Sequence, residues 1–224
     1  MLAVRMAGPS IPADRTLWRP QVARPSRRAR TIVDPIIEPL WEGVHVLVHA
    51  RDGTVRLIDD EGYDIGREFA AILAALRDDL TVSDAIVDGW LTNQATRSGE
   101  GLALVPVEAP RGMGIFRAPK PGPPRIAPHD RPGSVAFVAV DLLVLDGQVL
   151  FDLPLLERKR LLESVIVGGE LVRTSPYVRP PLDRWLPSWR AVGFTGAVLK
   201  AANSRYVPGA LADDWYVAQP LQRR

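Results

Sequence analysis

The sequence of 224 residues contains no cysteine, and this absence excludes several kinds of site at once. Disulfide bonds, thiolate zinc sites and thiol nucleophiles all require the cysteine side chain. Thiol redox chemistry is therefore not expected. The fold has to be stabilised by packing without covalent cross-links.

Lysine is also scarce, because only Lys120, Lys159 and Lys200 stand among the 28 basic residues and the others are arginines. A guanidinium stays protonated at any physiological pH, whereas a lysine amine can lose its proton and attack a substrate. Few side chains are therefore available for catalysis by a nucleophilic amine.

No stretch of about 18 apolar residues, the length that spans a bilayer, occurs in the sequence. Residues 1–7 include Arg5 but lack the continuous apolar segment of a secretory leader. We therefore predict a cytoplasmic protein without membrane contact. Its hydrophobic content of 46% is ordinary for a globular domain with a substantial core.

Positive charge is concentrated at the start of the chain, where seven arginines face only Asp14 in residues 1–30. These residues carry a net charge of +6, so the other residues carry −4 to reach the total of +2. With no sustained apolar period, the segment resembles a disordered or loosely attached basic arm. Arginine runs are often only solvated charge, but this one favours an anionic partner such as DNA. The candidate nucleic-acid contacts are Arg15, Arg19, Arg24, Arg27, Arg28 and Arg30.

We expect residues 31–224 to form the folded domain, beginning with a hairpin of strands at 44–49 and 55–58 around Asp52-Gly53. A helix after Asp64 buries apolar residues spaced three and four apart, and strands follow at 85–87 and 135–145. The second of these turns at Asp146-Gly147, and another helix begins at Pro154. The proline-rich stretch at about 105–133 is predicted to be a surface loop.

Five blocks in order resemble the adenylation (nucleotidyltransferase) domain of small bacterial ATP-dependent DNA ligases. The blocks span most of residues 34–220: Glu38-Pro39-Leu40-Trp41-Glu42-Gly43, Val87-Asp88-Gly89, Val140 to Gly147 with Leu153 to Arg158, Gly193 to Lys200, and Tyr206 to Trp215. Each block alone is weak evidence, since pairs such as Asp88-Gly89 are common in turns. Their order makes the set specific.

The resemblance implies an α+β fold of the nucleotidyltransferase (ATP-grasp-like) type, with two antiparallel sheets packed with helices around a nucleotide cleft. It also implies ATP and magnesium as cofactors if the chain acts as a ligase. The sequence ends soon after the last block, so we expect no C-terminal oligonucleotide-binding barrel of the kind that usually follows in ligases.

The chain departs from the family where the family performs its chemistry. The lysine that attacks the α-phosphorus of ATP, forming lysyl-AMP, is replaced by Leu40, and an alkyl side chain has no substitute for that amine. Asp60 stands where the family has an arginine that contacts the nucleotide. Trp90 and Thr195 stand where it has two glutamates near the metal ion, and Val217 and Gln219 stand where it has two lysines. We therefore expect neither a metal site nor a bound cofactor.

Glu38, which the resemblance places beside adenine, and Lys200 are the nucleotide-contacting positions that remain. Lys200 is equally compatible with a solvated lysine at a strand end. His45 and His49 share one face of a strand without an evident third ligand, so a metal site there is not predicted. We expect Trp90 to pack against Leu40 and to fill the former nucleotide site.

The sequence favours a catalytically inactive ligase-like protein that binds nucleic acid or a DNA-repair partner. Two other functions stay open. One is an active ATP-dependent DNA ligase that joins breaks in repair or recombination, and the other is a structural interaction module without a ligand.

Overall fold

The computed structural model describes residues 11–26, 31–94, 135–191 and 193–218. The predicted proline-rich loop at 105–133 lies outside these ranges, as do Arg27, Arg28, Arg30 and Gln219.

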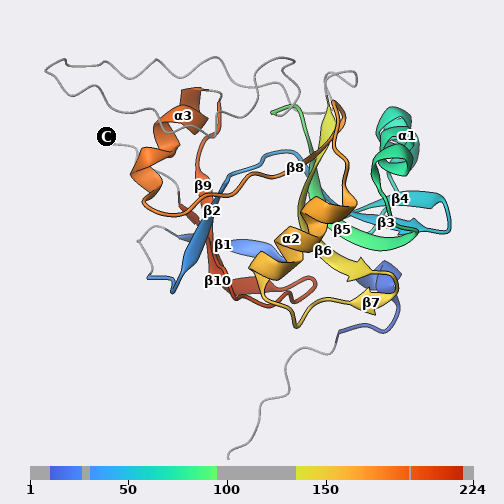
Figure 1. Ribbon diagram of the computed structural model, residues 1–224, viewed down its shortest axis with the longest axis horizontal. Coiled ribbons are helices and arrows are strands. Elements are labelled where there is room, and N and C mark those ends of the chain that lie inside the picture. The colour runs from blue at the N-terminus through green and yellow to red at the C-terminus, as the bar shows by residue number, and fades with distance from the viewer. Residues whose placement is uncertain (1–10, 27–30, 95–134, 192, 219–224) are drawn as a thin grey trace, which may run out of the picture.

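Two sheets face each other across the molecule, one on the left and one on the right of Figure 1. The first sheet has the strand order β1 (Val22–Ser26), β10 (Leu211–Ala218), β9 (Ala197–Ala201) and β2 (Pro35–Pro39). The second has the order β4 (Thr54–Asp59), β3 (Val44–Arg51), β5 (Asp84–Thr92), β6 (Ala136–Leu145) and β7 (Gln148–Val149), with β8 (Val172–Thr174) beside β6.

Most neighbouring strands are antiparallel, as predicted, and the α+β class is confirmed. Each sheet also contains one parallel pair, β1 with β10 and β6 with β8. The helices are short: α1 (Ala70–Asp79), α2 (Leu155–Val165) and α3 (Leu186–Ala191), with 3-10 turns η1 (Arg15–Leu17), η2 (Gly66–Phe69) and η5 (Leu182–Arg184).

Both predicted hairpin turns are confirmed. Asp52 and Gly53 have φ values of 49° and 77°, and Asp146 and Gly147 have 47° and 80°. Aspartate tolerates this left-handed region and glycine enters it freely, which is why Asp-Gly closes two-residue hairpins.

Alternation along the strands divides the core between the two sides of the second sheet. Val46 and Val48 of β3 pack with Phe69, Ile72 and Leu76 beneath α1, as the helical spacing predicted. Leu47 points to the other side and packs with residues of the first sheet. His45 and His49 share the side of Leu47, because side chains alternate along a strand, and this side faces the first sheet.

The prediction of a loosely attached arm at residues 1–30 is wrong for residues 11–26. Trp18 is only 3% exposed, and its indole donates a hydrogen bond to the carbonyl of Pro12. β1 pairs with β10, and the backbone N–H of Gln21 donates to the Tyr206 hydroxyl at 2.8 Å. Burial of one indole and strand pairing stabilise this segment. The high arginine content of the segment predicted neither feature.

Two of the arginines assigned to the arm are held by the folded domain. Arg15 donates to the carbonyl of Gly147 at 2.7 Å and lies 3.5 Å from Asp84. Arg24 forms an ion pair with Asp213 at 2.6 Å, whereas Arg19 donates to the carbonyls of Thr16 and Trp18 within the segment itself. The guanidinium groups of Arg15 and Arg24 therefore contribute to attaching the N-terminal segment.

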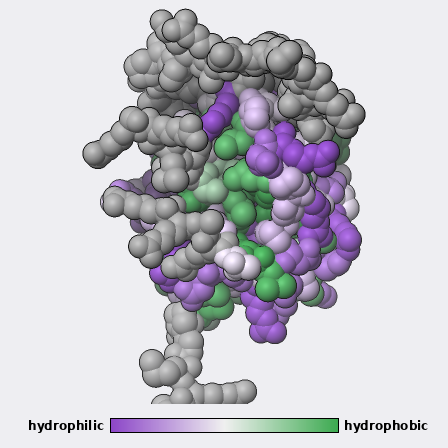
Figure 2. Space-filling model, turned by 90° about the vertical axis from the view of Figure 1, so that its left-hand side faces the viewer, coloured by the Kyte–Doolittle hydropathy of each residue, from purple (hydrophilic) through white to green (hydrophobic). Residues whose placement is uncertain are grey.

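The side of the molecule on which β2, β9 and α3 lie is shown in Figure 2. Hydrophobic residues gather in the middle of this face, and hydrophilic residues border them. Among the described residues no helix has the length and apolar character needed to cross a membrane.

Candidate functional site

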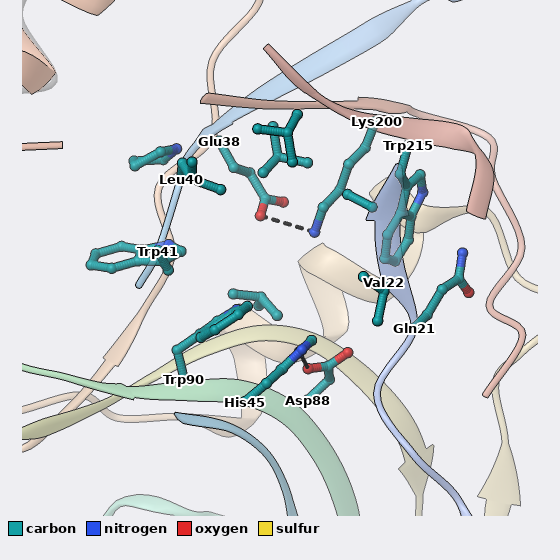
Figure 3. Close-up of a pocket in the computed structure, with 15 residues that line it drawn as sticks. Gln21, Val22, Glu38, Leu40, Trp41, His45, Asp88, Trp90, Lys200 and Trp215 are labelled. Carbon is teal, nitrogen blue, oxygen red and sulfur yellow. Dashed lines mark hydrogen bonds and ion pairs between the residues drawn. The ribbon is translucent and has the colours of Figure 1, made fainter. Parts of the chain in front are cut away.

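A pocket of about 150 Å³ lies between the two sheets, where the resemblance places the nucleotide. Strands from both sheets supply its walls, so it forms only when the domain is assembled (Figure 3). Its lining is mostly apolar and consists of Gln21, Val22, Ala23, Glu38, Pro39, Leu40, Trp41, His45, Asp88, Trp90, Val140, Val198, Lys200, Trp215 and Val217.

The structure brings five of the predicted site positions into this lining: Glu38, Leu40, Trp90, Lys200 and Val217. Two others lie elsewhere. Asp60 is exposed in the turn after β4, and exposed Thr195 donates a hydrogen bond to the carboxylate of Glu42.

Glu38 is the charged centre of the pocket and receives two ammonium groups. Lys200 Nζ donates to its Oε2 at 3.0 Å, and Lys159 Nζ lies 2.6 Å from its Oε1 without hydrogen-bond geometry. All three side chains are buried, so Lys200 is not a solvated lysine. Burial alone raises the pKa of Glu38, but the ammonium groups of Lys159 and Lys200 outweigh it and hold this pKa below its usual value.

Lys159 extends from α2 and was not predicted as a site residue. Burial lowers its pKa below the usual value, although the Glu38 carboxylate opposes that shift. Lys159 and Lys200 are the two lysines among the described residues, and both pair with the Glu38 carboxylate.

Three indole rings line the pocket. Trp41 donates from Nε1 to Ser175 Oγ at 2.9 Å, and Trp215 donates to Ser204 Oγ at 2.7 Å. Lys200 Nζ lies 4.3 Å from the centre of the Trp215 ring. The polar ends of two indoles and the cation are thus already satisfied within the protein.

Trp90 does not fill the site as predicted. Its ring stacks on the His45 imidazole, with centroids 4.2 Å apart and an angle of 11° between the planes. A neighbouring imidazole on the adjacent strand β3 offers a flat partner for the indole, and the pocket between Trp90 and the first sheet stays open.

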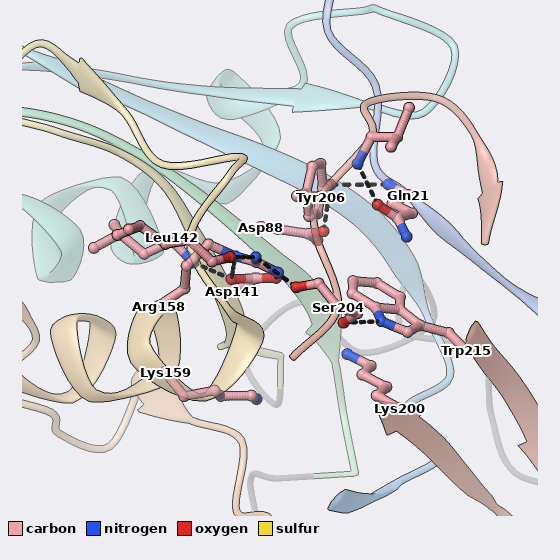
Figure 4. Close-up of polar contacts among 12 residues, drawn as sticks. Gln21, Asp88, Asp141, Leu142, Arg158, Lys159, Lys200, Ser204, Tyr206 and Trp215 are labelled. Carbon is pink, nitrogen blue, oxygen red and sulfur yellow. Dashed lines mark hydrogen bonds and ion pairs between the residues drawn. The ribbon is translucent and has the colours of Figure 1, made fainter. Parts of the chain in front are cut away.

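His45 belongs to a chain of hydrogen bonds at the base of the pocket; Figure 3 shows its pair with Asp88, and Figure 4 shows the link from Asp88 through Tyr206 to Gln21. Its Nε2 is 2.6 Å from Asp88 Oδ1, and the Tyr206 hydroxyl donates to Asp88 Oδ2 at 2.6 Å. Burial, and then the Asp88 carboxylate, raise the pKa of Tyr206 well above its usual value. The chain links β3, β5 and the N-terminal segment, and each oxygen of the Asp88 carboxylate takes part in one of its contacts.

Asp141 and Arg158, which lie in two parts of one resemblance block, form a fully buried ion pair. The guanidinium donates twice to the carboxylate, with both distances at 2.8 Å, and also to the carbonyl of Ser204 at 3.0 Å. This pair attaches α2 to β6 and thereby positions Lys159, the next residue in the helix.

The described residues that line the pocket do not fit ATP with magnesium. Pockets for drug-sized ligands usually measure about 300–1,000 Å³, whereas this one measures about 150 Å³. The nearby ammonium groups are paired with Glu38, so a triphosphate finds no unpaired lysine among the described residues. No group of three or more histidine, aspartate or glutamate side chains in the described ranges is placed to hold a metal ion.

Sequence reasoning missed Lys159, Trp41, Trp215 and the pair of His45 with Asp88. Because lysine is scarce in the sequence, each lysine, including Lys159, was a candidate for a site residue. Trp215 was treated only as part of a closing strand, and its place in the pocket depends on the packing of the two sheets.

The family model "ATP dependent DNA ligase domain" matches residues 20–217 of this chain. A DNA ligase of Methanothrix thermoacetophila is 28% identical over 193 residues, which cover 83% of this chain and 32% of that protein. The multifunctional non-homologous end joining protein LigD of Mycobacterium bovis is 30% identical over 179 residues, or 80% of this chain and 20% of that protein. The chain thus spans a third or less of these curated relatives.

Solved structures with the same fold include the ligase domain of M. tuberculosis LigD, with a TM-score of 0.64 and 22% identity over 92% of this chain and 60% of that one. A mycobacterial DNA ligase D complexed with ATP and MES has a TM-score of 0.65 over 92% of this chain and 61% of that one, again at 22% identity. The similarity confirms the nucleotidyltransferase fold predicted from the motifs.

Proposed function

Since this chain belongs to the ATP-dependent DNA ligase domain family, we propose that it is a catalytically inactive ligase-like protein that binds DNA in repair or recombination. The observation that carries the proposal is the state of the amines in the cleft. By the resemblance of the first motif, Leu40 stands where the family has its nucleophilic lysine, and Lys200 donates a hydrogen bond to Glu38. A nucleophilic lysine has to be unpaired and deprotonated to attack phosphorus, and neither residue meets that requirement.

Adenylation is tested by incubating the protein with α-labelled ATP and magnesium. We expect no acid-resistant label on the parent and none on Leu40→Lys, because the positions that the resemblance assigns to the supporting carboxylates and basic groups hold other residues. These are Asp60, Trp90, Thr195, Val217 and Gln219. ATP with magnesium should likewise leave the melting temperature of the parent unchanged. A labelled lysine in either protein, or magnesium-dependent stabilisation by ATP, contradicts the proposal.

Leu40→Lys should also melt at a lower temperature than the parent, because a third ammonium group enters a pocket in which the Glu38 carboxylate already faces two. A loss of 1 kcal/mol lowers the melting temperature of a protein of this size by about 2–4 °C. Leu17→Lys is the matched control, since Leu17 is 55% exposed and lies outside the pocket.

The charge distribution supports a DNA contact through arginines that lie outside the described residues. The described residues hold 16 lysines and arginines against 23 aspartates and glutamates, a net charge of −7. DNA phosphates are repelled by such a body and attracted by clustered arginines. We therefore assign the principal phosphate contacts to Arg27, Arg28 and Arg30, since Arg15 and Arg24 are engaged by Asp84 and Asp213.

The DNA proposal predicts binding without sequence preference and with strong salt dependence. Each neutralised phosphate contributes a slope of roughly −0.9 to a plot of log affinity against log salt. Replacing Arg27, Arg28 and Arg30 with alanine should reduce the steepness of that plot by up to about 2.7, measured by fluorescence anisotropy with duplex DNA.

The control for this triple variant is Arg51→Ala with Arg77→Ala, which removes exposed arginines from the second sheet and α1. An unchanged salt slope in the triple variant removes these three arginines from the proposal. Absence of any DNA binding by the parent favours an interaction module without a nucleic-acid ligand.

A further inference from the structure

We propose that the cleft between the two sheets binds an uncharged aromatic ring instead of a nucleoside triphosphate. This inference concerns the same pocket as the proposed function and rests on it in one respect, namely that the cleft performs no adenylation. It adds the chemical class of a ligand.

The charged groups of the pocket are paired with one another. Glu38 is neutralised by Lys159 and Lys200, and Asp88 accepts hydrogen bonds from Tyr206 and His45. An incoming anion or cation loses its hydration and finds no unpaired charged partner among the described lining residues, which makes its burial costly. An uncharged ligand loses little hydration and leaves these pairs intact.

The walls of the pocket suit a flat ring. Trp41, Trp90 and Trp215 come from different strands or connections and all line the pocket, and Figure 3 shows the Trp90 and Trp215 rings on different sides of it. Trp41 and Trp215 are 4% and 2% exposed and are fixed by hydrogen bonds to Ser175 and Ser204. Rigid aromatic rings bind another ring by stacking or edge contacts, and ordering them adds little entropic cost.

The volume of the pocket is suited to one aromatic ring system without a phosphate tail. An apolar cavity of about 150 Å³ in another protein admits a benzene ring, and this pocket has a similar volume of about 150 Å³. Branched aliphatic side chains, Val22, Val140, Val198 and Val217, complete the lining. Apolar contact with these side chains contributes about 25 cal/mol for each Å² removed from water.

The test compares uncharged rings with the same ring carrying a charged tail. Indole, adenine and ATP with magnesium are titrated into the full-length protein by isothermal calorimetry at pH 7.5. We expect at least one uncharged ring to bind with a Kd at least tenfold below that of ATP. Tighter binding of ATP than of adenine, or no heat from either uncharged ring, overturns the inference.

A matched pair of variants locates the binding. Val22→Trp places a bulky ring at the pocket wall, and Val149→Trp places the same ring on β7, outside the lining. The two valines are 49% and 48% exposed, so neither substitution enters a packed core. We expect Val22→Trp to weaken ring binding at least tenfold and Val149→Trp to leave it unchanged, with both variants folded. Equal binding by the two variants places the ligand elsewhere and overturns the inference.

Mass spectrometry of the ATP-treated protein separates this inference from the proposed function. A protein-linked AMP contradicts the proposed function, whereas a failure of ring binding without an adduct contradicts only the inference.

Discussion

Replacing Glu38 with glutamine is expected to lower the free energy of unfolding by about 3–5 kcal/mol, the usual cost of breaking a buried ion pair from one side. Glu38 is 1% exposed and is the carboxylate partner of two ammonium groups that are themselves buried. Glutamine keeps the shape of the side chain and removes its charge, so Lys159 and Lys200 are left facing each other. Urea unfolding at pH 7 measures the change.

The glutamine variant should recover part of this loss as the pH rises. Burial already lowers the pKa of Lys159 below its usual value with Glu38 present, and without the carboxylate it falls further. The unfolded chain then binds more protons than the folded one, so stability increases with pH until the unfolded lysine also loses its proton. A penalty that is independent of pH contradicts the assignment of the loss to unpaired ammonium groups.

The control is Glu38→Gln combined with Lys159→Met, which removes one of the two unpaired ammonium groups with little change in side-chain volume. If the ion pair carries the effect, the double variant should be more stable than Glu38→Gln alone. Equal stability of the two shows that Glu38 acts through packing, and the coupling energy is then near zero.

The cluster at Glu38 shows what sequence reasoning reached and what it missed. The first motif placed Glu38 and Leu40 correctly on the cleft wall, because a motif fixes residues within one short segment. It could not give Lys159 as the partner of Glu38, since Lys159 lies 121 residues further along, on a helix that the buried pair of Arg158 with Asp141 holds against β6. Contacts between distant segments depend on the packing of both sheets.

The prediction of a disordered N-terminal segment failed for a different reason. Its composition is that of a solvated chain, and composition averages over residues 1–30. Trp18 and Gln21 nevertheless provide one buried ring and one buried hydrogen bond, and β1 completes the edge of the first sheet. A few anchoring residues determine whether such a segment is ordered, and the surrounding arginines conceal them in any average.

Trp90 illustrates the same limit within a correctly predicted strand. Its position on β5 follows from the alternation along the second sheet, but the choice between Leu40 and His45 as its contact depends on the strand order, which places β3 beside β5. Local patterns predict the strand, whereas pairing between strands determines the neighbour across the sheet.

His49 makes the protein sensitive to acid, and we expect it to cost about 2 kcal/mol of stability between pH 7 and pH 5. Its Nε2 is buried without a hydrogen-bond partner among the described residues. Burial, and then the nearby guanidinium groups of Arg56, Arg15 and Arg19, lower the pKa of His49 from 6.5 to about 4. As the pH falls below 6.5, His49 binds a proton in the unfolded chain but stays neutral in the folded protein, so the unfolded state is favoured.

This loss begins near pH 6.5 and is complete near pH 4, where it reaches about 3 kcal/mol, because each unit of difference between the two pKa values corresponds to 1.36 kcal/mol. His49→Leu cannot take up a proton and should lack this part of the acid dependence. Carboxylates such as Glu38 and Asp64, whose pKa values are lowered in the folded state, also lose stabilising charge in acid, but they do so in both proteins. The difference between parent and variant therefore isolates the imidazole. Urea unfolding of both proteins at pH 7, 6 and 5 measures it, and parallel loss of stability in the two excludes His49 as the source.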